Sequence, residues 1–124
     1  MTELARHEVG SRERAQPPPP ASVFEALTHP DRDPTRPWLL LLDDEQPPRV
    51  LEAAYPDLVV WSSLWPRRPD ARVRFELAPD GRSGTMVLWR LLVTEPLPDA
   101  SLLGHLRKRL NQLINADLRY AFGQ

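Results

Sequence analysis

The chain has 124 residues, which is enough for one domain with a single hydrophobic core. Sixteen basic and seventeen acidic side chains give a net charge of −1, so the protein lacks the strong positive field that attracts nucleic acids and anionic lipids. It contains no cysteine, which excludes disulfide bonds, thiolate metal ligands and a cysteine nucleophile.

The longest uncharged apolar run covers only residues 38–42, whereas a helix that crosses a bilayer needs about 20 apolar residues. Residues 1–7 lack the apolar segment of a secretion signal. Fifteen of the sixteen basic residues are arginine, a bias that we attribute to a GC-rich bacterial genome. We therefore predict a bacterial, cytoplasmic protein without a membrane span, with one domain over residues 1–124 in which residues 1–5 are disordered.

Fifteen prolines divide the chain into short segments, because a proline inside a helix removes a hydrogen bond and costs about 3 kcal/mol. Most proline-free intervals in the middle of the chain have the length of a β-strand. Only the interval after Pro98 has room for a long helix. The spacing thus predicts several strands followed by one C-terminal helix.

The first third of the chain predicts a strand, a connector and a short helix. Residues 6–14 are polar and suit an edge strand, and residues 17–20 are four prolines that form a stiff, extended connector. Residues 21–27 predict a short helix with one apolar face. Residues 28–37 are polar and rich in proline, as in a loop, and residues 38–42 suit either a buried strand or a helical turn.

The middle of the chain predicts an antiparallel meander. Four segments between turn signals are expected to be its strands: residues 49–55, 58–65, 72–77 and 85–94. Residues 79–84 contain two glycines and predict the hairpin loop between the last two strands. Alternation in these two strands places the following side chains toward the core: Val73, Phe75, Leu77, Val87, Trp89, Leu91 and Val93.

The C-terminal segment predicts an amphipathic helix of about twenty residues, with Asp99 as its N-cap. Its apolar stripe consists of Leu102, Leu103, Leu106, Leu110, Leu113 and Ala121. Arg107 and Arg109 flank this stripe, where long side chains can keep their charged ends in water. The helix needs an apolar surface to pack on, and the predicted sheet supplies one.

Asp117 interrupts the apolar stripe of this helix. A carboxylate there must be paired, protonated or exposed to solvent. The favoured interpretation is an ion pair with an arginine or a hydrogen bond from backbone N–H groups. The alternatives are a polar anchor or proton acceptor inside a ligand cavity, and a last turn that frays into water.

Three short motifs, in this order and spacing, resemble those of one superfamily. Residues 19–28 (PPASVFEALT) resemble an opening in which a strand leads through a proline to a helix. Residues 56–61 (PDLVVW) and 84–88 (GTMVL) resemble the beginnings of two of its strands. The chain thus resembles the START/birch-pollen-allergen-like (SRPBCC) superfamily, in particular a small bacterial branch related to polyketide cyclases and to the heat-shock-chaperone activator homology group. The resemblance implies an α+β helix-grip fold, in which a curved antiparallel sheet wraps around a long C-terminal helix and a short N-terminal helix completes the domain.

The sequence contains no evident catalytic constellation. The three histidines lack metal-ligand spacing, and Ser62 and Ser63 lack the glycines of a nucleophile elbow. Residues 43–45 are three acids that can chelate a hard cation but more often form a solvated turn. The basic residues 107–109 are too few for a nucleic-acid footprint. We expect no metal, no cofactor and no nucleic-acid partner.

The resemblance implies an apolar cavity between the sheet and the C-terminal helix. The residues expected to line it are Trp61, Ser63, Trp65, Phe75, Trp89, Leu106, Leu110, Leu113 and Asp117. A dry core filled by the same side chains is the equally weighted alternative. We predict that the protein binds a small hydrophobic molecule, lipid-like or polyketide-like, as a monomer or homodimer. Two further hypotheses are a polyketide cyclase- or dehydratase-like enzyme that uses Asp117 or a serine as acid or base, and a co-chaperone-type module that binds another protein.

Overall fold

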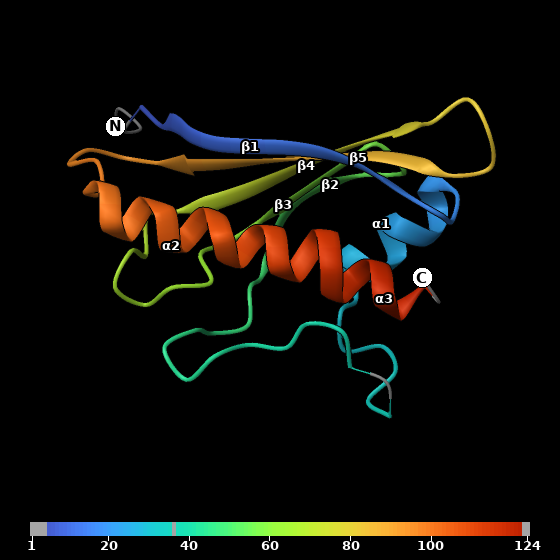
Figure 1. Cartoon of the computed structure of the whole chain (residues 1–124), viewed down its shortest axis with the longest axis horizontal. Helices are drawn as coiled ribbons and strands as arrows, with labels where there is room; N and C mark the ends of the chain where they lie inside the picture. The colour runs from blue at the N-terminus through green and yellow to red at the C-terminus, as the bar shows by residue number, and fades with distance from the viewer. Residues whose placement is uncertain (1–4, 36, 123–124) are drawn as a thin grey trace.

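The computed structural model describes residues 5–35 and 37–122 (Figure 1). A sheet forms one layer, and the long C-terminal helix lies across one of its faces (Figure 1). The other face of the sheet carries no helix from the described residues (Figure 1). We expected residues 1–5 to be disordered. Of these, residues 1–4 lie outside the residues that the structure describes.

Five antiparallel strands form one sheet in the order β1-β5-β4-β3-β2, which confirms the predicted meander. The strands are β1 (His7–Gln16), β2 (Val50–Ala54), β3 (Leu58–Trp61), β4 (Arg72–Pro79) and β5 (Thr85–Val93). The predicted inward positions of β4 and β5 are all buried, with exposed fractions of 5% or less. The alternation of apolar residues therefore identified the face of the sheet that meets the helix.

The strand expected over residues 58–65 is wrong beyond Trp61, where the chain leaves the sheet. The hydroxyl of Ser63 accepts a hydrogen bond from the backbone N–H of Trp65 at 2.9 Å and donates to the carbonyl of Trp65 at 3.0 Å. Such a local side-chain bond offers the backbone an alternative to the ladder of a sheet. It turns the chain, so Trp65 enters the core from a loop rather than from a strand.

Residues 38–42 form neither the strand nor the helical turn that we expected. They are irregular, and their apolar side chains point in different directions: Trp38 is buried, whereas Leu40 and Leu42 are exposed. Its backbone is held by side chains outside the segment: Arg109 donates to the carbonyl of Leu40, and Glu45 accepts from the N–H of Leu42. Local periodicity therefore carried no information about it.

The short helix α1 (Pro20–Thr28) begins with a proline in its first turn, where the missing N–H would have had no helical partner. Val23 and Leu27 are buried, as the predicted apolar face requires. Phe24 lies edge to face against Tyr55, with ring centroids 5.1 Å apart. The helix thus packs against β3 and β4, beside the turn that joins β2 to β3.

The C-terminal helix is continuous over residues 100–121 and has three parts: α2 (Ala100–Leu110), the π-helical segment η1 (Asn111–Leu118) and α3 (Arg119–Ala121). Leu106, Leu110 and Leu113 are fully buried, as predicted. Three side-chain bonds connect the helix to β1: Gln16 Nε2 donates to the carbonyl of Ile114 at 2.9 Å, Arg107 to the carbonyl of Val9, and Arg119 to the carbonyl of Ala15 at 3.2 Å. The helix is therefore attached to the edge strand as well as packed on the sheet.

The π-helical segment changes which residues face the sheet. A π turn closes i→i+5 bonds and takes up roughly one residue more per turn than an α turn, so later residues rotate away from the positions that a regular α period predicts. Leu118 is fully buried, whereas Ala121, which we expected in the apolar stripe, is exposed. Asp117 likewise moves from the middle of the stripe to its flank, beside Trp38 and Leu40.

The N-cap of α2 provides a direct test of the predicted helix start. The Oδ1 atom of Asp99 accepts a hydrogen bond from the backbone N–H of Leu102 at 2.8 Å. Asp99→Ala is expected to lower the free energy of unfolding by about 1 kcal/mol, because that N–H loses its partner. Urea denaturation measures the loss. Asp43→Ala is the control, since Asp43 is exposed and makes no side-chain bond within the described residues, and an equal loss there would contradict the role of Asp99.

Candidate ligand-binding pocket

Seven of the nine residues predicted to line a cavity lie together between the helix and the sheet. They are Trp61, Trp65, Phe75, Trp89, Leu106, Leu110 and Leu113, and none is more than 1% exposed. The rings of Trp61 and Phe75 meet edge to face with their centroids 4.7 Å apart. Ser63 lies in the turn after β3, and Asp117 lies on the flank of the helix. The seven side chains therefore pack together as part of the hydrophobic core.

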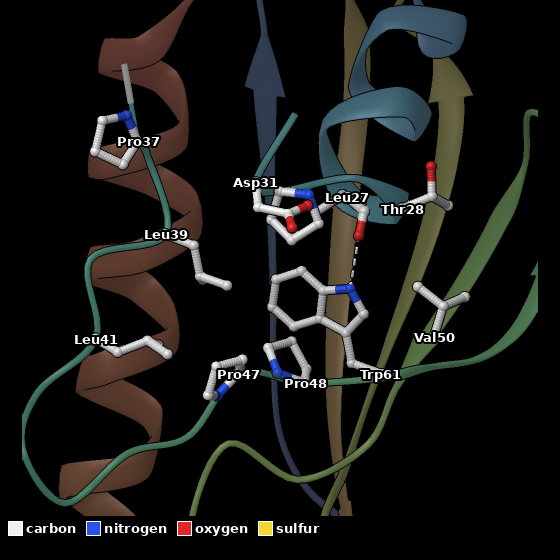
Figure 2. A pocket seen from close by; sticks show the side chains of 11 residues that line it. Leu27, Thr28, Asp31, Pro37, Leu39, Leu41, Pro47, Pro48, Val50 and Trp61 are labelled. Carbon is white, nitrogen blue, oxygen red and sulfur yellow. Dashed lines mark hydrogen bonds between the residues drawn. The ribbon is translucent and has the colours of Figure 1, made fainter. Parts of the chain in front are cut away.

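A pocket of about 390 Å³ opens at the edge of this core, beside Trp61 (Figure 2). It lies between the end of α1, the loop that joins α1 to β2, and the strands β2 and β3. Its lining is Leu27, Thr28, Pro30, Asp31, Pro37, Leu39, Leu41, Pro47, Pro48, Val50 and Trp61. All of these side chains except Thr28 and Asp31 are apolar. Both the volume and the lining fall within the range typical of small-molecule sites.

The indole of Trp61 forms one wall of the pocket and is held in place by two contacts. Its Nε1–H donates to the carbonyl of Leu27 at 2.8 Å (Figure 2). Its ring stacks on that of Trp38, with centroids 6.1 Å apart and an angle of 27° between the planes. The hydrogen bond also satisfies one of the last carbonyls of α1, which have no partner within the helix. A flat, apolar surface is therefore preformed.

Another wall is the loop between α1 and β2, and Arg109 of α2 holds this loop. Arg109 donates to the two carboxylate oxygens of Glu45 at 2.8 and 2.7 Å and to the carbonyl of Leu40 at 3.0 Å. Glu45 also accepts from the backbone N–H of Leu42 at 2.8 Å and from the indole N–H of Trp65 at 3.1 Å. Bidentate pairing of this kind fixes both orientation and distance. The loop is thereby joined to the helix and to the core.

The Glu45–Arg109 pair is buried, with side chains 0% and 5% exposed, so the predicted solvated turn over residues 43–45 is wrong for Glu45. Burial alone raises the pKa of Glu45, but the hydrogen bonds from Arg109, Leu42 and Trp65 and the charge of Arg109 outweigh burial. The pKa therefore lies below its ordinary value of 4.5. Glu45 is ionised at neutral pH, and the bond between loop and helix is a charged one. Arg109 was expected to keep its charged end in water, and its burial is a second correction.

The alternative interpretation of residues 43–45 as a hard-cation site involves the same Glu45–Arg109 ion pair. Asp44, Glu45 and His105 each offer one ligand atom, and these atoms lie within 4.8 Å of one another. However, both oxygens of Glu45 already accept hydrogen bonds from Arg109, which neutralises the carboxylate. A metal ion would have to displace a bidentate guanidinium. The cluster is better described as an ion-pair network around Arg109.

Asp117 lies outside this pocket, at a separate cleft on the flank of the helix. Its carboxylate makes no hydrogen bond and no ion pair within the described residues, so the favoured interpretation of a paired aspartate is wrong. Burial raises the pKa of Asp117, and the positive charge of Arg109 opposes this effect. The surroundings of Asp117 thus disfavour the charged form of its carboxyl group.

Most of the pocket lining was not predicted from the sequence. Of the nine expected residues, only Trp61 contributes to it. The loop residues Leu39 and Leu41 point into the pocket, and Pro47 and Pro48 lie below the indole (Figure 2). Residues 38–42 are all apolar, so the sequence has no alternation that would single out Leu39 and Leu41 as the residues facing the pocket.

An antiparallel sheet that packs on a long C-terminal helix, with a short helix after the first strand, defines the helix-grip fold of START/birch-pollen-allergen-like proteins. The chain has this fold, as its motifs predicted. CalU16 from Micromonospora echinospora is similar with a TM-score of 0.64 and 18% identity, over 93% of this chain and 80% of that chain. The Aha1 dimer from Colwellia psychrerythraea is similar with a TM-score of 0.64 and 13% identity, over 95% and 96% of the two chains. Ara h 8.0201 is similar with a TM-score of 0.59 and 17% identity, over 97% and 100%.

The sequence itself matches no protein-family model and no curated protein. No helix within residues 5–35 and 37–122 combines the length and apolar character that crossing a membrane requires.

Proposed function

We propose that the protein binds a small hydrophobic molecule in the pocket beside Trp61. The observation that carries this proposal is an open, mostly apolar pocket of about 390 Å³ whose walls are held in place. The indole of Trp61 is fixed by two contacts, and the loop is fixed by the buried Glu45–Arg109 pair. Preformed walls lower the entropy that a ligand would otherwise lose in ordering them.

The lining favours a flat, apolar body with a single hydroxyl, as in lipid-like or polyketide-like molecules. Leucine, proline, valine and tryptophan side chains supply the apolar surface. Asp31 is exposed at the pocket and can accept a hydrogen bond from a ligand hydroxyl. The hydroxyl of Thr28 donates to the carbonyl of Phe24 at 2.9 Å, and its oxygen also lies 3.1 Å from Nδ1 of His29, so at most one lone pair remains for a ligand donor.

Titration with 2-naphthol, followed by NMR of the tryptophan indole N–H groups, tests the proposal. We expect saturable shifts of the Trp61 indole resonance. Val50→Arg should weaken binding about tenfold or more, because it places a charge in an apolar lining. Leu51→Arg is the matched control: Leu51 is the next residue of β2, is 42% exposed compared with 40% for Val50, and does not line the pocket.

Binding that survives Val50→Arg, or that is lost equally in Leu51→Arg, would contradict the pocket as the site. Shifts confined to the indole of Trp89, which is buried in the core away from the pocket, would also contradict it. They would show instead that the ligand enters between the helix and the sheet.

A further inference from the structure

A second cleft, of about 310 Å³, lies between the end of the C-terminal helix and the loop that follows α1. It is lined by Pro37, Trp38, Leu40, Asp117, Tyr120 and Ala121. Successive residues of the loop line the two hollows in turn: Leu39 and Leu41 line the Trp61 pocket, whereas Trp38 and Leu40 line this cleft. Pro37 lines both hollows, but Asp117, Tyr120 and Ala121 line this cleft and not the Trp61 pocket, so its occupant need not be that of the first pocket.

Asp117 is the only charged residue in this lining, and it forms no ion pair within the described residues. Within the described residues no group donates a hydrogen bond to it. Arg109, whose positive charge reaches Asp117, already donates to Glu45, to the carbonyl of Leu40 and to the side chain of Gln112. Asp117 also lies near the C-terminus of the helix, where the helix dipole disfavours an anion.

The rest of the cleft is apolar and aromatic, and part of it is freely exposed. Tyr120 is 79% exposed and Leu40 is 53% exposed. Aromatic faces and an unpaired carboxylate are the two groups that proteins use to bind organic ammonium ions. An inorganic cation, in contrast, needs several oxygen ligands, and this lining has a single carboxylate.

We propose that this cleft binds a small organic ammonium ion, with the charged nitrogen paired to Asp117 and the apolar part lying between Leu40 and Tyr120. Such a ligand supplies the counter-charge that Asp117 lacks and covers the two exposed apolar side chains at the same time. Burial raises the pKa of Asp117 although the positive charge of Arg109 opposes this effect, and a bound ammonium would lower the pKa further toward its ordinary value. The inference is independent of the proposal for the Trp61 pocket.

Three probes of nearly equal shape separate charge from size. We expect 2-phenylethylammonium to bind and to shift the backbone amide resonances of Asp117 and Tyr120. Neutral 2-phenylethanol should bind about tenfold or more weakly, because it cannot pair with the carboxylate. Anionic 3-phenylpropionate should not bind. Equal binding of all three probes, or no binding of the amine, would overturn the proposal.

Two variants test which carboxylate pairs with the amine. Asp117→Asn keeps the shape of the side chain and should weaken amine binding about tenfold or more. Asp31→Asn is the matched control, because Asp31 is the carboxylate that lines the Trp61 pocket, and it should leave amine binding unchanged. Loss in Asp31→Asn, or retention in Asp117→Asn, would overturn the assignment. The thermal unfolding of both variants, which we expect to match the wild type within a few degrees, shows that they are folded.

Discussion

Replacing Arg109 by methionine should lower the free energy of unfolding by about 3 kcal/mol or more. Methionine retains much of the aliphatic length of arginine but leaves the carboxylate of Glu45, which is fully buried, without its counter-charge. Water cannot reach the carboxylate to replace the lost partner, so the desolvation cost is no longer offset. Urea denaturation at neutral pH, followed by circular dichroism, measures the difference.

Arg107→Met is the matched control on the same helix. Arg107 is exposed and donates to the backbone carbonyl of Val9, so its replacement leaves no buried charge. We expect a loss of about 1 kcal/mol or less. Equal losses in the two variants would contradict the conclusion that Arg109 holds the loop against the helix. Arg109→Met should also weaken the binding of 2-naphthol, because Leu39 and Leu41 lie on that loop.

The pH dependence gives a second readout of the same pair. Because the pKa of Glu45 is lowered on folding, the pair stabilises the wild type above pH 4.5, and this stability is lost as the pH falls through the lowered pKa of the folded state. In Arg109→Met, burial without a counter-charge raises the pKa of Glu45. Protonation of Glu45 at lower pH then removes the cost of a buried, unpaired carboxylate in the variant. The difference in unfolding free energy between wild type and variant should therefore shrink as the pH falls from 7 toward 4. A constant difference would contradict the charged character of the pair.

Trp61→Ala should lower the free energy of unfolding by about 3–5 kcal/mol. Trp61 is fully buried, contacts the rings of Trp38 and Phe75, and donates a hydrogen bond to the carbonyl of Leu27. Alanine removes one wall of the pocket and leaves a cavity and an unsatisfied carbonyl. We expect the binding of 2-naphthol to be lost together with the stability, as measured by urea denaturation and titration of the folded variant.

Two further variants divide this effect into its causes. Trp61→Phe keeps an aromatic ring but removes the N–H, so it should cost about 1–3 kcal/mol, mainly through the carbonyl of Leu27. Tyr55→Ala is the control for the loss of an aromatic side chain, because Tyr55 is 69% exposed, and it should cost about 1 kcal/mol or less. If Trp61→Ala were no more destabilising than Tyr55→Ala, the indole would not be the structural wall that the contacts indicate.

The strands and the helix packing surface were predictable because their signals are local. Alternation at Val73, Phe75 and Leu77 identifies the buried face of β4, and a period of two residues allows no second assignment. The N-cap at Asp99 and the leucine stripe of α2 are likewise encoded within one or two turns. These features were sufficient for the fold, and the motifs that resemble SRPBCC proteins agreed with them.

The flank of the helix could not be predicted in the same way. A regular α period places Asp117 in the apolar stripe and leaves Leu118 out of it, whereas the π-helical segment reverses the two. The side chain of Gln16, which is distant in sequence, donates to the carbonyl of Ile114 within that segment. A contact of this kind has no trace in the periodicity of the helix itself.

The sequence alone determined which residues form the sheet, which face of it is buried, and where the C-terminal helix begins, because neighbouring residues encode these properties. Only the tertiary structure decided where the loop between α1 and β2 lies. The described residues of that loop form no helix or strand, and its position depends on Arg109, 64 residues beyond Glu45. Both candidate sites use this loop as a wall, so the binding surfaces of the protein arise from contacts between distant segments. A pattern confined to one segment cannot specify them.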